Sequence, residues 1–189
     1  MNGEAVLDMF RKSGALLEGH FRLTSGLHSD RYFQSALVLQ YPEFASALGG
    51  ALASRLAHLQ ATAILSPALG GIVIGQEVGR ALGVRAMFAE RVDGTLTLRR
   101  GFMLSPADRV IVVEDVVTTG GSTRETIDVA NAAGATVAGA AALVDRSGDS
   151  AKVPVPLFSL VQMNVAAYDP TSCPLCANGT PVIKPGSRV

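Results

Sequence analysis

The chain has 189 residues, of which 48% are hydrophobic, and 16 basic and 16 acidic side chains give a formal net charge of zero. This composition suits a protein with a substantial buried core, and the charge balance gives no support to a nucleic-acid partner. No apolar run approaches the roughly 18 to 20 residues of a membrane span, and residues 1–10 lack the basic region and apolar core of a signal peptide. We therefore expect a cytoplasmic protein with no membrane or nucleic-acid partner.

The first forty residues predict one helix and two strands. Apolar residues at helical spacing run from Val6 to Leu17 and stop at Gly19. Strand-like segments follow at 21–24 and 31–39, on either side of a polar turn.

From residue 42 onward, helical periods alternate with short apolar runs. Helices are predicted over 42–58, 72–82 and 122–133, and strands over 63–66, 84–89, 110–113 and 138–144. Strands separated by helices of this length indicate βαβ crossovers, so we predict an α/β fold with a mainly parallel sheet flanked by helices. No linker is evident, so one domain is expected over 1–189, with its core sheet at about 60–147 and an irregular tail at about 165–189.

The loop that follows the most strand-like run has the composition of a phosphate site. Thr118, Thr119 and Ser122 offer hydroxyls, while Gly120 and Gly121 let backbone N–H groups converge without a Cβ in the way. The next helix adds its N-terminal N–H groups and the positive end of its dipole. Together these groups suit a monophosphate, and the lack of a Walker-type lysine disfavours a nucleoside triphosphate. The alternative is a glycine-rich turn that only begins a helix.

Two carboxylates, Glu114 and Asp115, precede this loop at the tip of the predicted strand. Ligands of a parallel α/β sheet bind at the carboxyl ends of its strands, where both acids would lie. A pentose 5-phosphate spans the distance from such acids to the phosphate loop, with its hydroxyls on the carboxylates.

Three segments carry a resemblance to a known family. Residues 110–123, VIVVEDVVTTGGST, resemble the phosphoribosyl-diphosphate signature of the type I phosphoribosyltransferases. The segments Gly19-His20-Phe21 and Thr24-Ser25-Gly26, with the pair Tyr32-Phe33, resemble the N-terminal part of the members of that family that act on orotate. Leu143-Val144-Asp145-Arg146 resembles their Asp-Arg pair at a later strand end.

The resemblance implies the type I phosphoribosyltransferase fold, with a small N-terminal hood at about 1–40. It also implies transfer of ribose 5-phosphate from phosphoribosyl diphosphate to orotate, which gives orotidine 5'-phosphate and pyrophosphate in pyrimidine nucleotide synthesis. The implied cofactor is Mg²⁺, carried by phosphoribosyl diphosphate rather than by a protein ligand that we can name. The implied assembly is a homodimer in which a mobile loop closes over the neighbouring subunit's site.

The site residues implied by the resemblance fall into three groups. The catalytic residues are Glu114 and Asp115. The residues for phosphoribosyl diphosphate are Glu114, Asp115, Val116, Val117, Thr118, Thr119, Gly120, Gly121, Ser122, Gly70, Gly71 and Arg91. The residues for orotate are Thr118, Arg146 and His28.

Each of these roles has a structural alternative. The segment 67–71 is also an ordinary turn between strand and helix, and Arg91 would also suit a solvated hairpin. Arg146 could pair with Asp145 or another acid instead of the orotate carboxylate, and His28 could be a structural or simply solvated histidine.

The sequence also departs from the better-known bacterial pattern. His28 replaces a lysine, the segment 67–71 lacks another lysine, and the loop 90–101 is basic only through arginines. A phosphoribosyltransferase for another base, such as a purine, or a non-catalytic regulator that senses phosphoribosyl diphosphate therefore stays open as an alternative.

Cys173 and Cys176 have the spacing of half a zinc site. A structural zinc site needs four ligands, and no second pair of cysteines exists in the sequence. Two subunits could complete such a site only if their tails met, so we expect reduced, structural thiols.

Overall fold

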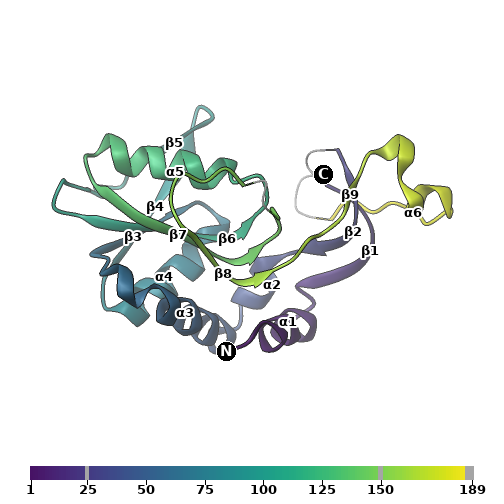
Figure 1. The fold of residues 1–189 in the computed structure, drawn as a ribbon, viewed down its shortest axis with the longest axis horizontal. Coiled ribbons are helices and arrows are strands. Elements are labelled where there is room, and N and C mark those ends of the chain that lie inside the picture. The colour runs from purple at the N-terminus through teal and green to yellow at the C-terminus, as the bar shows by residue number, and fades with distance from the viewer. Residues whose placement is uncertain (24–25, 149–150, 186–189) are drawn as a thin grey trace.

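The computed structural model describes residues 1–23, 26–148 and 151–185. Thr24 and Ser25, which contributed to the family resemblance, lie outside the described residues. The described residues form a six-stranded and a three-stranded sheet (Figure 1). None of their helices has the length and apolarity that a bilayer span requires.

The larger sheet confirms the predicted α/β fold. Its strands are β3 (Ala63–Pro67), β4 (Arg85–Val92), β5 (Thr95–Leu98), β6 (Arg109–Val117), β7 (Thr136–Asp145) and β8 (Leu157–Gln162). Their order is β5-β4-β3-β6-β7-β8, and every neighbouring pair is parallel except β4 and β5. β8 was not predicted, and it extends the sheet beyond the expected limit near residue 147.

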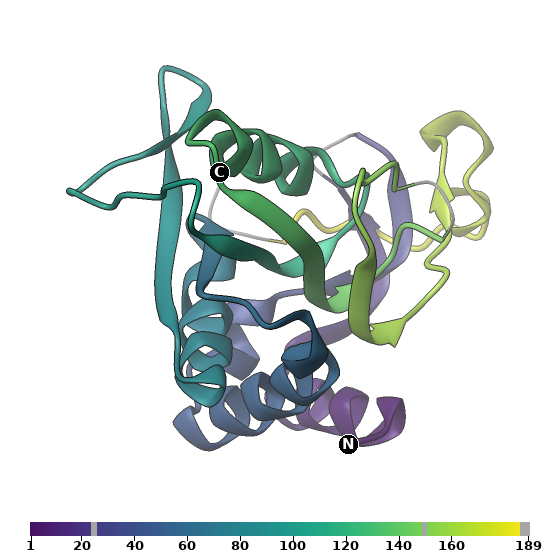
Figure 2. The same ribbon diagram turned by 60° about the vertical axis from the view of Figure 1, so that its left-hand side comes forward.

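Helices cover both faces of this sheet, as Figures 1 and 2 show. One face packs against α1 (Gly3–Lys12), α3 (Pro42–Leu56) and α4 (Gly70–Leu82), and the other packs against α5 (Gly121–Ala132). Within β6, Ile111 and Val113 belong to the first core, whereas Val110 and Val112 belong to the second. All four side chains are fully buried. This two-sided burial explains the uninterrupted apolar run, which is typical of a central parallel strand.

The hood differs from its prediction in two places. Its strands β1 (Leu16–Arg22) and β2 (His28–Phe33) form an antiparallel pair, followed by the short helix α2 (Ser35–Leu39). The predicted first helix ends early because Gly14 adopts φ +69, after which the chain enters β1. The strand predicted over 31–39 ends at Phe33, because the apolar residues of α2 pack into the core as a helix.

The C-terminal tail returns to the hood. β9 (Ala167–Tyr168) pairs with β2 as the third strand of the small sheet, and η2 (Pro170–Ser172) and α6 (Pro174–Ala177) follow it. Ile183 forms an isolated bridge to Phe21 of β1. The remaining helical element, η1 (Ala57–Leu59), directly follows α3. The tail expected to be irregular thus contains short elements and lies against the N-terminal hood (Figure 1).

Candidate functional site

The predicted loops meet at the point where the sheet changes direction. β3 and β6 are neighbours, but β3 continues through α4 to β4 on one side, whereas β6 continues through α5 to β7 on the other. The loops after β3 and β6 therefore diverge and leave a crevice, which is where open α/β sheets bind their ligands.

The backbone of the loop after β3 lies directly against Asp115, at the end of β6. A Cβ placed on Gly70 would come within 2.8 Å of Asp115 Oδ1, and one on Gly71 would come within 2.9 Å of the Val113 carbonyl oxygen. The approach to the Val113 backbone favours glycine at position 71, whereas a side chain at position 70 would have to displace the Asp115 carboxylate. The structure thus places Gly70 against Asp115 and Gly71 against the backbone at the end of β6.

The two acids differ in environment. Glu114 is buried, and its carboxylate accepts hydrogen bonds from Ser122 Oγ at 2.8 Å and from the Asp115 backbone N–H at 3.2 Å. Burial, followed by the neighbouring charge of Asp115, raises the pKa of Glu114 well above its usual range. Asp115 is half-buried and faces the loop after β3. Proximity of a raised-pKa carboxyl to a second acid is a common mark of a functional site.

The phosphate loop has the geometry of a helix N-terminus. Gly120 is the N-cap of α5 with φ +73, a backbone conformation that favours glycine. Thr118 and Thr119 are exposed, so their hydroxyls are accessible to a ligand. A Cβ on Gly120 would come within 3.1 Å of Val153 Cγ2, whereas one on Gly121 would meet only Thr119 Oγ1, at 3.7 Å. The two glycines therefore differ in how much room surrounds them.

The two valines before this loop contribute differently from the hydroxyl residues. Val117 is buried, and its carbonyl oxygen accepts the backbone N–H of Arg146 at 2.8 Å. Val116 is half-buried and packs against the core of the α3 and α4 face. The side chains of the two valines support the phosphate loop. The hydrogen bond from the Arg146 N–H to the Val117 carbonyl oxygen connects this loop to the end of β7.

Arg146 is the most distinctive side chain near the loop. Its guanidinium carbon lies 5.6 Å from the ring centre of Phe33, and its Nε is buried without a hydrogen-bond partner. Desolvation lowers the pKa of Arg146, although the nearby charges of Asp30 and Tyr32 partly oppose that shift. Asp30 also has a buried carboxylate oxygen, Oδ1, without a partner. A buried donor without a partner costs about 1 to 3 kcal/mol, more for a charged group, so this position suits an anionic ligand.

Pairing of Arg146 with Asp145 finds no support in the described part of the chain, whereas Asp30 is near enough for its charge to raise the pKa of Arg146. The Asp145 carboxylate accepts hydrogen bonds from the Ser147 N–H and hydroxyl and from Gln162 Nε2. Among the described residues, no ion pair within 4.0 Å joins Arg146 to an acid.

The basic loop is an antiparallel hairpin of β4 and β5, which projects beyond the helices in Figure 2. Arg91 pairs with Glu125 of α5 at 2.8 Å, and Arg99 and Arg100 pair with Glu90 at 3.4 and 2.8 Å. All three arginines therefore form ion pairs within their own chain here, although Arg99 and Arg100 share the single carboxylate of Glu90. A role on a diphosphate would require them to exchange these partners.

His28 contacts different residues from those expected. Its ring is buried, with Nδ1 at 2.8 Å from His20 Nε2 and 3.3 Å from Cys176 Sγ. Both ring contacts are with His20 and with the C-terminal tail, which argues against the predicted role of His28 in binding orotate.

The sequence analysis did not identify Asp30 as a site residue, and it gave Phe33 no role. Their only signal was their position on the strand that carries the aromatic pair.

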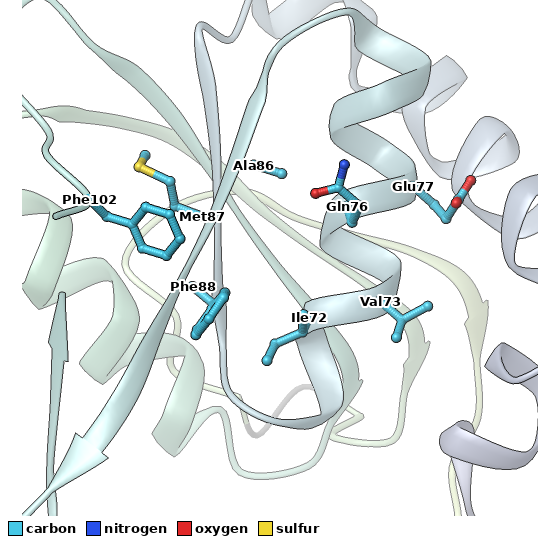
Figure 3. Close-up of a pocket in the computed structure, with 8 residues that line it drawn as sticks. All are labelled: Ile72, Val73, Gln76, Glu77, Ala86, Met87, Phe88 and Phe102. Atoms are coloured by element: carbon cyan, nitrogen blue, oxygen red, sulfur yellow. The ribbon is translucent and has the colours of Figure 1, made fainter. Parts of the chain in front are cut away.

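Two cavities lie near these elements. One, of about 320 Å³, is lined by Gln34, Ala36, Leu39, Gln40, Leu69, Gly70, Val73 and Asp115. It borders the crevice and extends beneath the hood helix α2. The other, of about 330 Å³, lies between α4 and β4 and is lined by Ile72, Val73, Gln76, Glu77, Ala86, Met87, Phe88 and Phe102 (Figure 3). This second groove contains none of the predicted site residues.

Comparison with known proteins adds independent evidence. The chain is 56% identical over 190 residues to an orotate phosphoribosyltransferase of Heliobacterium modesticaldum, covering 100% of both chains. It is 54% identical over 188 residues to that of Chlorobaculum parvum, covering 100% of this chain and 97% of the relative. The crystal structure of orotate phosphoribosyltransferase from Aeropyrum pernix matches with a TM-score of 0.71 at 27% identity, over 84% of this chain and 93% of that one. No family model matches the chain.

Proposed function

Because this chain belongs to the orotate phosphoribosyltransferase family, we propose that its loop 114–122 binds phosphoribosyl diphosphate and that Arg146 binds orotate. The enzyme transfers ribose 5-phosphate to orotate in pyrimidine biosynthesis. In this reaction orotate N1 forms a bond to the sugar C1 as the bond from C1 to the diphosphate oxygen breaks. The products are orotidine 5'-phosphate and pyrophosphate.

The observation that carries the assignment of the base is the buried Nε of Arg146, which has no partner. A guanidinium binds a planar carboxylate through two parallel hydrogen bonds, and orotate carries such a carboxylate whereas purine bases do not. The backbone bond from Arg146 to Val117 holds this side chain beside the phosphate loop. The ring of Phe33, whose centre lies 5.6 Å from the guanidinium carbon, adds a cation–π contact to this side chain.

The sugar phosphate occupies the loop between the acids and α5. The 5-phosphate accepts hydrogen bonds from Thr118, Thr119 and the backbone N–H groups at the start of α5. The carboxylates of Glu114 and Asp115 accept hydrogen bonds from the ribose hydroxyls and place negative charge near the ring as it gains positive charge. No protein nucleophile is required, so positioning and electrostatics supply the acceleration.

Magnesium fits the donor set at this crevice. Hard cations take oxygen ligands, and Mg²⁺ commonly uses one or two carboxylates together with substrate phosphates. Asp115, which is less buried than Glu114, is the better placed of the two acids to contact a magnesium-bound diphosphate. When bound, the cation neutralises charge on the departing diphosphate.

We also infer a homodimer that uses the apolar face around the groove of Figure 3. Val73 is 44% exposed and lines this groove with Phe88 and Phe102, while Leu69, 83% exposed, lines the other cavity together with Val73. Met103, 74% exposed, follows Phe102 in the chain. Apolar side chains clustered on a surface in this way mark an interaction site. Sedimentation of the protein and of a Val73→Asp variant tests this assembly. If the parent protein is monomeric, the inferred homodimer is wrong. The cytoplasmic location of the protein remains a prediction.

A base panel tests the proposed function. The protein is incubated with phosphoribosyl diphosphate, Mg²⁺ and one of orotate, uracil, hypoxanthine or adenine, and pyrophosphate release is followed. Uracil is the matched control because it is orotate without the carboxylate. We expect turnover with orotate and little with the other bases. Preference for a purine would favour the alternative transferase, and binding of phosphoribosyl diphosphate without turnover of any base would favour a regulator.

A further inference from the structure

The tail and the hood bring four potential metal ligands into one cluster. His20 lies on β1, His28 begins β2, and Cys173 and Cys176 lie at the N-cap and within the first turn of α6. One ligand atom from each of the four residues lies within 4.8 Å of every other. Both histidines and Cys173 are buried, whereas Cys176 is exposed.

Three of the six distances among these atoms are close to those of a tetrahedral zinc site, and a fourth is shorter. Bonds of 2.0 to 2.1 Å to nitrogen and 2.3 Å to sulfur predict edges of about 3.4 Å between two nitrogens and about 3.6 Å between nitrogen and sulfur. His20 Nε2 lies 3.6 Å from Cys173 Sγ and 3.7 Å from Cys176 Sγ, and His28 Nδ1 lies 3.3 Å from Cys176 Sγ. The two ring nitrogens are 2.8 Å apart, so the rings would separate by about 0.6 Å on binding.

A second contact orients the first of these rings. His20 Nδ1 lies 2.7 Å from the Thr180 carbonyl oxygen. If Nδ1 carries the proton and donates it to that carbonyl, Nε2 is left with its lone pair toward the cluster. Metal-ligating histidines are commonly oriented by such a bond from the other ring nitrogen to a carbonyl.

The tail has little else to hold it in place. Among residues 166–185, Cys173 alone is buried. A short segment with so small an apolar core usually needs a disulfide or a metal to order it. The tail is joined to the hood by β9 and by the bridge of Ile183 to Phe21, and the cluster lies between those two contacts along the chain.

We propose that His20, His28, Cys173 and Cys176 form a structural zinc site that fastens the C-terminal tail to the N-terminal hood. Two thiolates and two imidazoles suit Zn²⁺ rather than the hard cation of the substrate. With all four positions filled by protein, the site offers no open coordination position, so its role is structural rather than catalytic. The proposed zinc site does not depend on which residues bind phosphoribosyl diphosphate and orotate.

The proposed site differs from the expectation drawn from the cysteines. The second pair of ligands comes from two histidines of the same chain, so a neighbouring subunit's tail is not needed. The histidine that was expected to hold orotate, His28, is one of these ligands.

Zinc content tests the proposal directly. The untagged protein, purified without chelators, is measured by elemental mass spectrometry, and we expect about one zinc ion per chain. Cys176→Ser and His28→Gln are expected to reduce this content by about tenfold or more. His58→Gln is the matched control, because the ring of His58 packs against Phe158 outside the cluster. It should keep one zinc ion per chain.

Cobalt substitution uses the native protein, so it tests the proposed zinc site even if the Cys176→Ser or His28→Gln variant fails to fold. The native protein is exchanged into Co²⁺, and tetrahedral coordination by thiolates gives intense visible bands and a near-ultraviolet charge-transfer band. The His58→Gln protein should show the same spectrum. Zinc below about 0.1 per chain, together with an octahedral cobalt spectrum, would overturn the proposal. So would a Cys173–Cys176 disulfide in protein isolated under reducing conditions.

Discussion

Reactive side chains gather in two regions of this molecule, and the two regions are built in opposite ways. At the strand ends, one continuous loop, 114–122, supplies most of the groups, and buried polar atoms such as Arg146 Nε remain without partners. At the junction of hood and tail, residues as far apart as His20 and Cys176, separated by 156 positions, contact one another directly. The strand-end site therefore retains binding capacity for a substrate, whereas the junction cluster is closed by its own four side chains.

The largest effect is expected from Arg146→Ala, which removes the charge that we assign to the orotate carboxylate. Loss of a charge-assisted contact costs roughly 2 to 4 kcal/mol. Catalytic efficiency toward orotate should therefore fall by about 30-fold to 1,000-fold. Steady-state kinetics with orotate, and calorimetry with phosphoribosyl diphosphate alone, separate the two substrates.

The matched control for this variant is Arg11→Ala, which removes an exposed arginine of α1 that pairs with Glu4. It should leave both measurements unchanged. If Arg146→Ala weakens binding of phosphoribosyl diphosphate as much as it weakens use of orotate, Arg146 is not the residue that recognises the base.

A smaller effect is expected from the first glycine of the phosphate loop. Gly120→Ala places a Cβ on a left-handed backbone, which costs about 1 to 2 kcal/mol, and brings it within 3.1 Å of Val153. If the loop relieves this strain by moving, affinity for phosphoribosyl diphosphate should fall by about 5-fold to 30-fold.

Gly121→Ala provides the comparison, because its Cβ would make only an ordinary contact with Thr119 Oγ1. Calorimetry should give nearly the parent affinity for this variant. Equal losses for the two substitutions would contradict the account based on backbone conformation.

Removal of the proposed zinc tests whether the two regions are coupled. β2 carries His28 at its start and both Asp30 and Phe33 further along, and the last two lie near Arg146. Loosening this strand adds an ordering cost of about 1 kcal/mol to orotate binding, so the KM for orotate should rise about fivefold.

The KM for phosphoribosyl diphosphate and the kcat should change little after chelation. The measurement is a pair of steady-state titrations before and after dialysis against a chelator, with restoration by added Zn²⁺. An unchanged KM for orotate in demonstrably zinc-free protein would show that the junction and the strand ends act independently.

The smallest effect concerns the pH dependence of stability. Because the pKa of Glu114 is raised in the folded protein, unfolding releases a proton between the usual glutamate pKa of about 4.3 and the raised value. The free energy of unfolding therefore falls as pH rises through that window, and the penalty persists above it.

Glu114→Gln cannot ionise and keeps an oxygen that can accept the Ser122 hydroxyl. Its unfolding temperature relative to the parent should therefore increase with pH, by about 2 to 4 °C for each kcal/mol of relief. Differential scanning calorimetry from pH 5 to pH 9 measures this difference. A difference that does not change with pH would show that Glu114 has an ordinary pKa.

The sequence by itself determined the parallel strands β3, β4, β6 and β7 and the loops at their carboxyl ends, but it predicted neither β5 nor β8. The apolar run of β6 and the glycines and hydroxyls after it are local patterns, because a central parallel strand and a phosphate-binding turn each depend on neighbouring residues. The rule that ligands bind at carboxyl strand ends then placed Glu114 and Asp115 at one edge without knowledge of their contacts, and the family resemblance added Arg146 at a later strand end.

Tertiary structure alone decided the details that depend on distant segments. The unpartnered Arg146 Nε arises because β2 of the hood places Phe33 against the end of β7. The four potential metal ligands meet because the tail adds β9 to the hood sheet and brings Cys173 and Cys176 to the histidines. A spacing pattern reports residues that are close along the chain, and these pairs are close only after the chain has folded.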